Sequence, residues 1–208
     1  MTLGLGTGST AHHFITGLGP LVAGGVRLRG IATSVASAEL GRQAGLEMLP
    51  DQAPLERPLD LAVDGADEVD DELRLVKGHG GALFREKLVA LAAARFIVIA
   101  DSTKLVQRLG RAQVPVEVAG FLWRQTARRL EALGAAWTLR GGESAPYLTD
   151  NRNLVLDLTF PGGLSQPEST AAALKAVPGV IEHGLFCGLA SGAVVAGPEG
   201  IRILGRLD

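Results

Sequence analysis

Short apolar runs alternate with helix-like stretches along the first hundred residues. Strands are predicted at residues 2–5, 26–32, 46–49, 59–63, 73–76 and 96–100, and helices at 11–18, at 34–44 and before residue 94. Strands that alternate with helices, and a last strand that is apolar throughout, are typical of a parallel sheet covered on both faces. The sequence therefore predicts an α/β fold.

The pattern changes after about residue 111. Strands are predicted at 114–118, 135–140, 153–159 and 180–185, with helices at 120–133 and 168–176. This β-α-β-β-α-β order is the ferredoxin-like split pattern, and it predicts a second, smaller α/β unit over residues 112–184. Residues 193–196 and 201–204 are predicted to form a hairpin that returns to the first sheet.

Composition and charge narrow the class of protein. Hydrophobic residues make up 47% of the 208 residues, which is typical of a globular protein and not of a disordered one. A net charge of −2 argues against nucleic acid or an anionic membrane as the main partner. The single cysteine, Cys187, excludes a disulfide framework and fits a reducing cytoplasm. No signal-peptide pattern and no apolar stretch of about 18 residues is present, so a cytoplasmic protein is expected.

The first candidate site is the glycine-rich turn after the first predicted strand. A strand that enters a glycine turn and then a helix presents backbone N–H groups and a positive dipole end to an anion. Thr7, Gly8, Ser9 and Thr10 lie at this turn. The glycine spacing is not that of a dinucleotide-binding fingerprint, and no lysine precedes the hydroxyl residues as in a Walker loop. The alternative is a plain tight turn.

The second candidate is a set of carboxylates after the strand at 59–63. Asp64 and Asp67 fall at its C-terminal end, where open α/β sheets bind their ligands. The spacing of a calcium loop is absent, so no metal is expected. Asp70, Asp71 and Glu72 are predicted to form a solvated turn. A purely structural role for Asp64 and Asp67 is the alternative.

Two further strand ends carry polar residues. Lys77 opens a glycine loop that leads into a helix with Glu86, and Lys104 follows the strand at 96–100. On that helix, an apolar stripe is predicted to face the core, which leaves Glu86 off the centre of the stripe; the stripe consists of Phe84, Leu88, Leu91 and Ala92. The alternative for Glu86 is a surface helix residue. Hydroxyls, carboxylates and lysines at four strand ends of one sheet predict a small, anionic, sugar-like ligand.

Four motifs together resemble the type A ribose-5-phosphate isomerase family. They are GTGST at 6–10, DGADEVD at 64–70, KGHGGALFREK at 77–87 and ADSTK at 100–104. The resemblance continues through PVEV at 115–118, DNRNLVLDL at 150–158 and PGVIEHGLF at 178–186.

The resemblance implies a fold and an assembly. It implies a Rossmann-like catalytic domain over 1–111 and 185–208, with a smaller inserted domain over 112–184 that contributes to a homodimer. It also implies an aldose–ketose isomerase, without cofactor or metal, that interconverts D-ribose 5-phosphate and D-ribulose 5-phosphate in the non-oxidative branch of the pentose phosphate pathway.

The resemblance also assigns site residues by motif position. The implied catalytic residues are Glu86 as general base with Asp64, Asp67 and Lys77. The implied substrate contacts are Thr7, Gly8, Ser9, Thr10, Asp64, Gly65, Ala66, Asp67, Lys77, Gly78, His79, Gly80 and Lys104. His79 departs from the glycine that is frequent there in the family and makes the loop bulkier.

Two other functions remain open. One is another sugar-phosphate transformation on a related fold, which would require a proton-shuttling group beyond Glu86; only His79 is placed for that role. The other is a sugar-phosphate sensor without turnover, which is expected to carry a basic DNA-binding segment that the sequence does not show.

Overall fold

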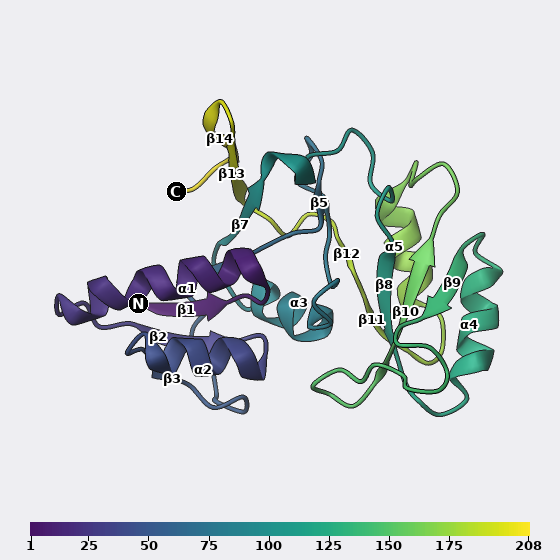
Figure 1. Cartoon of the computed structure of the whole chain (residues 1–208), viewed down its shortest axis with the longest axis horizontal. Coiled ribbons are helices and arrows are strands. Elements are labelled where there is room, and N and C mark those ends of the chain that lie inside the picture. Colours follow the sequence, from purple (N-terminus) through teal and green to yellow (C-terminus); the bar gives the residue numbers. More distant parts are fainter. The chain divides into compact units, whose positions relative to one another are not determined.

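The computed structural model describes all residues from 1 to 208, and the chain folds into two compact units (Figure 1). The first unit consists of Met1–Gly65, Arg85–Thr103 and Leu189–Asp208. The second unit consists of Ala66–Phe84 and Lys104–Gly188. No helix is long and apolar enough to cross a membrane.

These units differ from the domain boundaries expected at residues 111/112 and 184/185. Residues 66–84, 104–111 and 185–188 belong to the second unit because their short strands form a separate three-stranded sheet, in the order β12-β6-β5. Its strands are β5 (Glu68–Val69), β6 (Leu75–Val76) and β12 (Leu185–Phe186). The buried Glu68 carboxylate accepts the backbone N–H groups of Gly110, at 2.7 Å, and Ala112, which fixes the segment before residue 112 to β5.

The first unit is built on a seven-stranded sheet in the order β14-β13-β7-β4-β1-β2-β3. Its strands are β1 (Thr2–Leu5), β2 (Arg29–Ala32), β3 (Glu47–Met48), β4 (Leu61–Asp64), β7 (Phe96–Asp101), β13 (Gly192–Gly197) and β14 (Gly200–Gly205). All neighbouring pairs are parallel except the hairpin of β13 and β14. The predicted return of the C-terminal hairpin to this sheet is confirmed.

Helices cover both faces of this sheet, as the Rossmann-like prediction requires. Leu3 and Leu5 of β1 pack with Ile15 of α1 (Ser9–Ala23), and α2 (Val35–Gln43) joins the same apolar cluster. Gly4 faces the other side of the sheet, because successive strand residues alternate between faces. A Cβ at Gly4 would lie 2.4 Å from Cγ1 of Val89 on α3 (Leu83–Leu91), so the absent side chain lets that helix approach closely.

The second unit contains an antiparallel four-stranded sheet in the order β11-β8-β10-β9. Its elements are β8 (Val114–Val118), α4 (Trp123–Glu131), β9 (Ala136–Leu139), β10 (Leu154–Thr159), α5 (Pro167–Lys175) and β11 (Val180–His183). Val116 and Leu156 of the sheet share one buried cluster with Leu130 of α4 and Leu174 of α5. This order and these two helices are the predicted ferredoxin-like arrangement.

Candidate active site

The turn after β1 presents an uncapped helix N-terminus. Gly8 stands at the N-cap position of α1 with φ 107°, a backbone conformation that favours glycine, and no side chain caps the helix. Ser9 is exposed, and Thr7 and Thr10 are partly exposed. The first backbone N–H groups of a helix have no partner within it, so they are available to an anion together with the positive end of the helix dipole.

The Asp64 carboxylate is held directly beneath this turn. Its side chain is buried, and Oδ1 accepts the backbone N–H groups of Thr7 at 3.1 Å and Gly65 at 2.7 Å. A Cβ at Gly6 would lie 2.0 Å from the same Oδ1 atom. The glycine at position 6 therefore makes room for the carboxylate that the sequence placed at the end of β4.

A network of neutral hydroxyl groups supports the turn from behind. Thr7 Oγ1 lies 2.7 Å from Thr33 Oγ1, and Thr33 donates to the Leu5 carbonyl at 3.1 Å. Ser37 donates to the Gly6 carbonyl at 2.6 Å, and Ser34 caps α2 by accepting the Ser37 N–H at 3.1 Å. The contact of Thr33 and Ser37 with the turn was not predicted from the sequence motifs.

Glu86 lies on the buried face of α3 and is only 4% exposed, which excludes the alternative of a surface helix residue. The predicted stripe of Leu88 and Leu91 is wrong, because these side chains are 50% and 60% exposed. The buried positions are Leu83, Glu86, Lys87, Val89 and Ala90, and four of them, all but Val89, follow the spacing of one helix face. Glu86 and Asp64 border the same narrow space between α3 and the sheet, together with Gly4, Gly6 and Val89.

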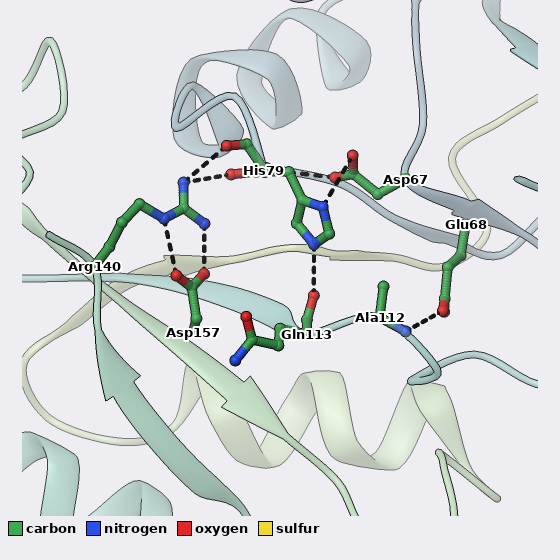
Figure 2. Close-up of polar contacts among 8 residues, drawn as sticks. Asp67, Glu68, His79, Ala112, Gln113, Arg140 and Asp157 are labelled. Carbon is green, nitrogen blue, oxygen red and sulfur yellow. Dashed lines mark hydrogen bonds and ion pairs between the residues drawn. The ribbon is translucent and has the colours of Figure 1, made fainter.

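In the second unit, Asp67 lies beside the glycine loop. Its Oδ2 accepts the backbone N–H of His79 at 3.0 Å, and Oδ1 is 3.5 Å from His79 Nδ1 (Figure 2). His79 Nε2 is 3.0 Å from the Gln113 carbonyl oxygen, which can only accept, so Nε2 carries the proton in that bond. The imidazole ring of His79 therefore lies between the Asp67 carboxylate and the Gln113 carbonyl oxygen.

The prediction that Asp70 belongs to a solvated turn is wrong. Asp70 is only 2% exposed, and its Oδ1 accepts the backbone N–H groups of Glu72 at 3.0 Å and Arg74 at 2.9 Å. Arg74 Nε donates to Oδ2 at 2.7 Å. Asp70 is thus a structural residue that closes the turn before β6, while Asp71 and Glu72 are exposed as expected.

Lys77 and the glycines after it form a tight loop. The Lys77 side chain is buried, and its Nζ lies 5.6 Å from the centre of the Phe186 ring. The Lys77 N–H donates to the Gly184 carbonyl at 2.8 Å, and the Gly81 N–H donates to the Gly78 carbonyl at 2.9 Å. Gly78 has φ 105°, and a Cβ there would lie 2.8 Å from Leu83 Cβ.

Lys104 ends a short 3-10 turn, Ser102–Lys104, directly after β7. It is partly exposed, and no hydrogen bond or ion pair with another residue neutralises its ammonium group. An unpaired lysine of this kind suits a phosphate as a point charge. Gly65, Ala66 and Gly80, the remaining predicted contacts, are partly or fully exposed backbone positions. No group of three or more His, Cys, Asp or Glu side chains in the chain is placed to hold a metal ion.

Two features of the site define a class of protein. An uncapped helix N-terminus can bind a small anion, and two buried carboxylates can transfer protons, so the mostly parallel sheet carries the functional groups of an α/β enzyme that acts on a small anionic substrate. Both features lie within the first unit.

Comparison with known proteins narrows this class. A family model for ribose 5-phosphate isomerase A (phosphoriboisomerase A) matches residues 29–200. The ribose-5-phosphate isomerase A of Roseiflexus sp. (strain RS-1) is 52% identical over 206 residues, covering 97% of this chain and 87% of that protein. The one from Sinorhizobium fredii (strain NBRC 101917 / NGR234) is 46% identical over 211 residues, covering 98% and 90%.

Solved structures agree. The ribose 5-phosphate isomerase from Plasmodium falciparum superposes with a TM-score of 0.93 at 29% identity, covering 100% of this chain and 92% of that one. A D-ribose-5-phosphate isomerase in complex with phospho-erythronic acid superposes with a TM-score of 0.92 at 38% identity, covering 99% and 91%. The chain belongs to the ribose 5-phosphate isomerase A family, and it is an isomerase.

Proposed function

We propose that Glu86 is the base with which this isomerase interconverts D-ribose 5-phosphate and D-ribulose 5-phosphate. The observation that carries the proposal is that Glu86 is buried on the face of α3 and borders the same narrow space as the buried Asp64 carboxylate. A general base must be held within reach of the proton that it removes, and a carboxylate fixed in the interior beside the turn is better suited to this role than a mobile surface carboxylate.

The chemistry requires one proton to move between neighbouring carbons. In the open-chain aldose, Glu86 removes the proton from C2, the electrons form the C1–C2 double bond of an enediolate, and the carbonyl oxygen at C1 takes up the negative charge. Transfer of the hydroxyl proton from the oxygen at C2 to the oxygen at C1, and return of the proton from Glu86 to C1, give the ketose. We assign Lys77 and backbone N–H groups to the developing oxyanion, and Asp64 or Asp67 to proton transfer among the sugar hydroxyls during ring opening.

We propose the remaining substrate contacts from the motifs and from what each group can donate. They are Thr7, Gly8, Ser9, Thr10, Gly65, Ala66, Gly78, His79, Gly80 and Lys104. The uncapped N-terminus of α1 and the unpaired Lys104 ammonium are suited to a phosphate. The relative solved with phospho-erythronic acid supports this chemistry, since that ligand joins a phosphate to a carboxylate that resembles an enediolate.

The test is Glu86→Gln, with Glu39→Gln as the matched control. Glutamine keeps the shape of glutamate but cannot accept the proton, so kcat is expected to fall at least about 100-fold. That loss corresponds to about 2.7 kcal/mol, at about 1.36 kcal/mol per tenfold. Glu39 lies on α2 with a side chain 57% exposed, and its variant is expected to retain full activity.

Two further measurements make this test specific. Binding of ribose 5-phosphate is expected to survive in the Glu86→Gln enzyme, because other groups hold the ligand. Exchange of the C2 proton with solvent is expected to vanish together with turnover. A variant with near-normal kcat would contradict the assignment and point to Asp64 or Asp67 as the base.

We also propose the wider setting that the family resemblance implies. The chain is expected to form a homodimer to which the second unit contributes, to act in the cytoplasm, and to serve the non-oxidative branch of the pentose phosphate pathway. Sedimentation at assay concentrations tests the first point, and a monomer that is fully active would contradict it.

A further inference from the structure

Arg140, immediately after β9, joins the glycine loop to the four-stranded sheet. Its Nη1 donates to the carbonyl oxygens of Gly78 and His79, both at 3.0 Å. Its Nε donates to Asp157 Oδ2 at 2.9 Å, and Nη2 donates to Asp157 Oδ1 (Figure 2). The side chains of Arg140 and Asp157 are only 17% and 13% exposed, so this ion pair is largely shielded from solvent.

These contacts fix the direction of two consecutive peptide groups. The C=O and N–H of a trans peptide point in opposite directions, and the chain has no cis peptide bond. Because both carbonyls point to Arg140, the N–H groups of His79 and Gly80 point away from it. The His79 N–H accordingly donates to Asp67 at 3.0 Å. Gly80 is an exposed residue, and its N–H donates to no group of the protein.

The guanidinium group is itself held in place. Asp157 lies on β10, opposite Thr138 of β9 and Pro115 of β8, so a paired strand carries its carboxylate. The Arg140 guanidinium lies 5.7 Å from the centre of the Tyr147 ring. The Tyr147 hydroxyl packs over the loop so closely that a Cβ at Gly81 would lie 2.1 Å from it.

A role in the sheet alone does not account for this geometry. The pairing with Asp157 uses Nε and Nη2, while both bonds from Nη1 are made to the loop. A lysine has one nitrogen and cannot make a planar pair with a carboxylate while also holding two carbonyls. The fork geometry of arginine is therefore matched to holding the loop.

We infer that Arg140 is a positioning residue, which turns the loop so that the Gly80 N–H faces the substrate oxygen that becomes negative during isomerisation. Asp157 acts through Arg140 by fixing the guanidinium plane. The inference rests on the proposed function, and it adds two residues that make no contact with the substrate. Arg140 lies outside the sequence motifs, and Asp157 lies in the motif at 150–158 but was given no role there.

The experiment compares Arg140→Ala, Arg140→Lys and Asp157→Asn with the unchanged enzyme. The matched control is Arg124→Ala in the same unit, because Arg124 also forms an ion pair, with Glu143, and packs on an aromatic ring. Its side chain is 60% exposed, and it does not contact the loop. Each variant is first checked for Tm and for folded fraction by circular dichroism.

Two ligands then separate positioning from general loosening of the fold. When the phosphate groups are aligned, the carboxylate of phospho-erythronic acid lies at the reacting C1–C2 end of the substrate, whereas erythritol 4-phosphate is neutral there. A hydrogen bond to a charged group contributes more than one to a neutral group. In Arg140→Ala, the Kd of phospho-erythronic acid is expected to rise about 10-fold, and the Kd of erythritol 4-phosphate to change less than about 2-fold.

The variants that bind the charged ligand less tightly are also expected to turn over more slowly. A misplaced donor acts on the transition state more than on bound substrate, so kcat is expected to fall about 10- to 100-fold with KM nearly unchanged. Arg140→Lys is expected to restore little of this loss. Asp157→Asn is expected to lose less, because asparagine keeps one acceptor, and adding it to Arg140→Ala is expected to cost nothing further.

The outcomes distinguish the two proposals. An unchanged enzyme without isomerase activity would contradict the proposed function. An active enzyme whose folded Arg140→Ala and Arg140→Lys variants keep normal kcat would overturn the role of Arg140 alone. Equal weakening of both ligands would also overturn it, because it would show general loosening of the site.

Discussion

The two loops that carry backbone donors are supported by different chemistry. In the first unit, the turn at residues 6–10 rests on the neutral hydroxyls of Thr33 and Ser37. In the second unit, the loop at residues 77–81 rests on the Arg140 guanidinium and its partner Asp157. Both supports bind backbone carbonyl oxygens of their loop, through Gly6 in one case and through Gly78 and His79 in the other.

The two supports differ in how many of their contacts a single substitution removes. The hydroxyl support consists of several weak hydrogen bonds, each of which contributes about 1 kcal/mol. The charged support places two carbonyls on one nitrogen atom, so a single substitution releases both. We therefore expect graded losses from changes behind the first turn and an abrupt loss from changes behind the second loop.

The largest effect is expected from Gly6→Ala, which breaks the first turn whatever supports it. The new Cβ would lie 2.0 Å from Asp64 Oδ1, so the carboxylate or the turn must move by about an ångström. A misplacement of that size costs about 100-fold, and kcat/KM is expected to fall at least that far.

Gly17→Ala is the control for this change. Gly17 lies inside α1, and nothing lies within 4 Å of the position that its Cβ would take. The variant is expected to keep full activity and to gain about 0.5–1 kcal/mol of stability. An active Gly6→Ala enzyme would show that the position of Asp64 does not limit the reaction.

Much of the fold could be predicted because its strands are apolar runs bounded by turn residues. The strands at 2–5 and 114–118 are found at the predicted residues. The division into these units was not predicted, because β5 has only two residues and β6, which lies in the predicted strand at 73–76, belongs to a separate sheet. The pairing of β6 with β12, more than a hundred residues later in the chain, is a tertiary contact that spacing does not reveal.

The site divides in the same way. Asp64, Glu86 and Lys77 stand in dense local motifs with polar residues at strand ends. Arg140 lies outside the motifs, Asp157 lies in a mostly apolar strand, and the link from Asp157 through Arg140 to the loop forms only in the folded chain. The apolar stripe of α3 was misjudged because the buried face carries Glu86 and Lys87. Charged residues on a buried helix face break the usual pattern, and such exceptions are expected at functional sites.

A smaller effect than that of Gly6→Ala or Arg140→Ala is expected from changes to the hydroxyls behind the turn. Ser37→Ala and Thr33→Val each remove a buried donor to a backbone carbonyl, and each is expected to cost about 1–3 kcal/mol in urea unfolding. The double variant is expected to lose less than the sum, because the two hydroxyls share Thr7. Thr16→Val, at an exposed position on α1, is expected to change stability by no more than about 0.5 kcal/mol.

The activity of these variants sharpens the comparison. With other bonds remaining in the network, kcat is expected to fall by less than about 10-fold, which is less than for Arg140→Ala. A hydroxyl variant that loses as much activity as Arg140→Ala would show that the neutral support is no more tolerant than the charged one.

The smallest effect concerns a charged group within the first unit, at the opposite ends of β1 and β4 from the turn. The Thr2 N–H donates to Asp60 Oδ2 at 2.6 Å, and this bond holds the pKa of the Asp60 carboxyl below its ordinary value of 3.8. A carboxyl with a lowered pKa stabilises the fold above its unfolded pKa, and this contribution is lost as the pH falls through the folded pKa.

Asp60→Asn is therefore expected to lower Tm slightly at pH 7, since asparagine still accepts the bond without its charge. The difference in Tm from the unchanged protein is expected to close as the pH falls below 3.8. The exposed Glu56 provides the control, Glu56→Gln, for which no such pH-dependent difference is expected. A difference for Asp60→Asn that persists at low pH would show that the shape of the side chain, and not its charge, joins these two strands.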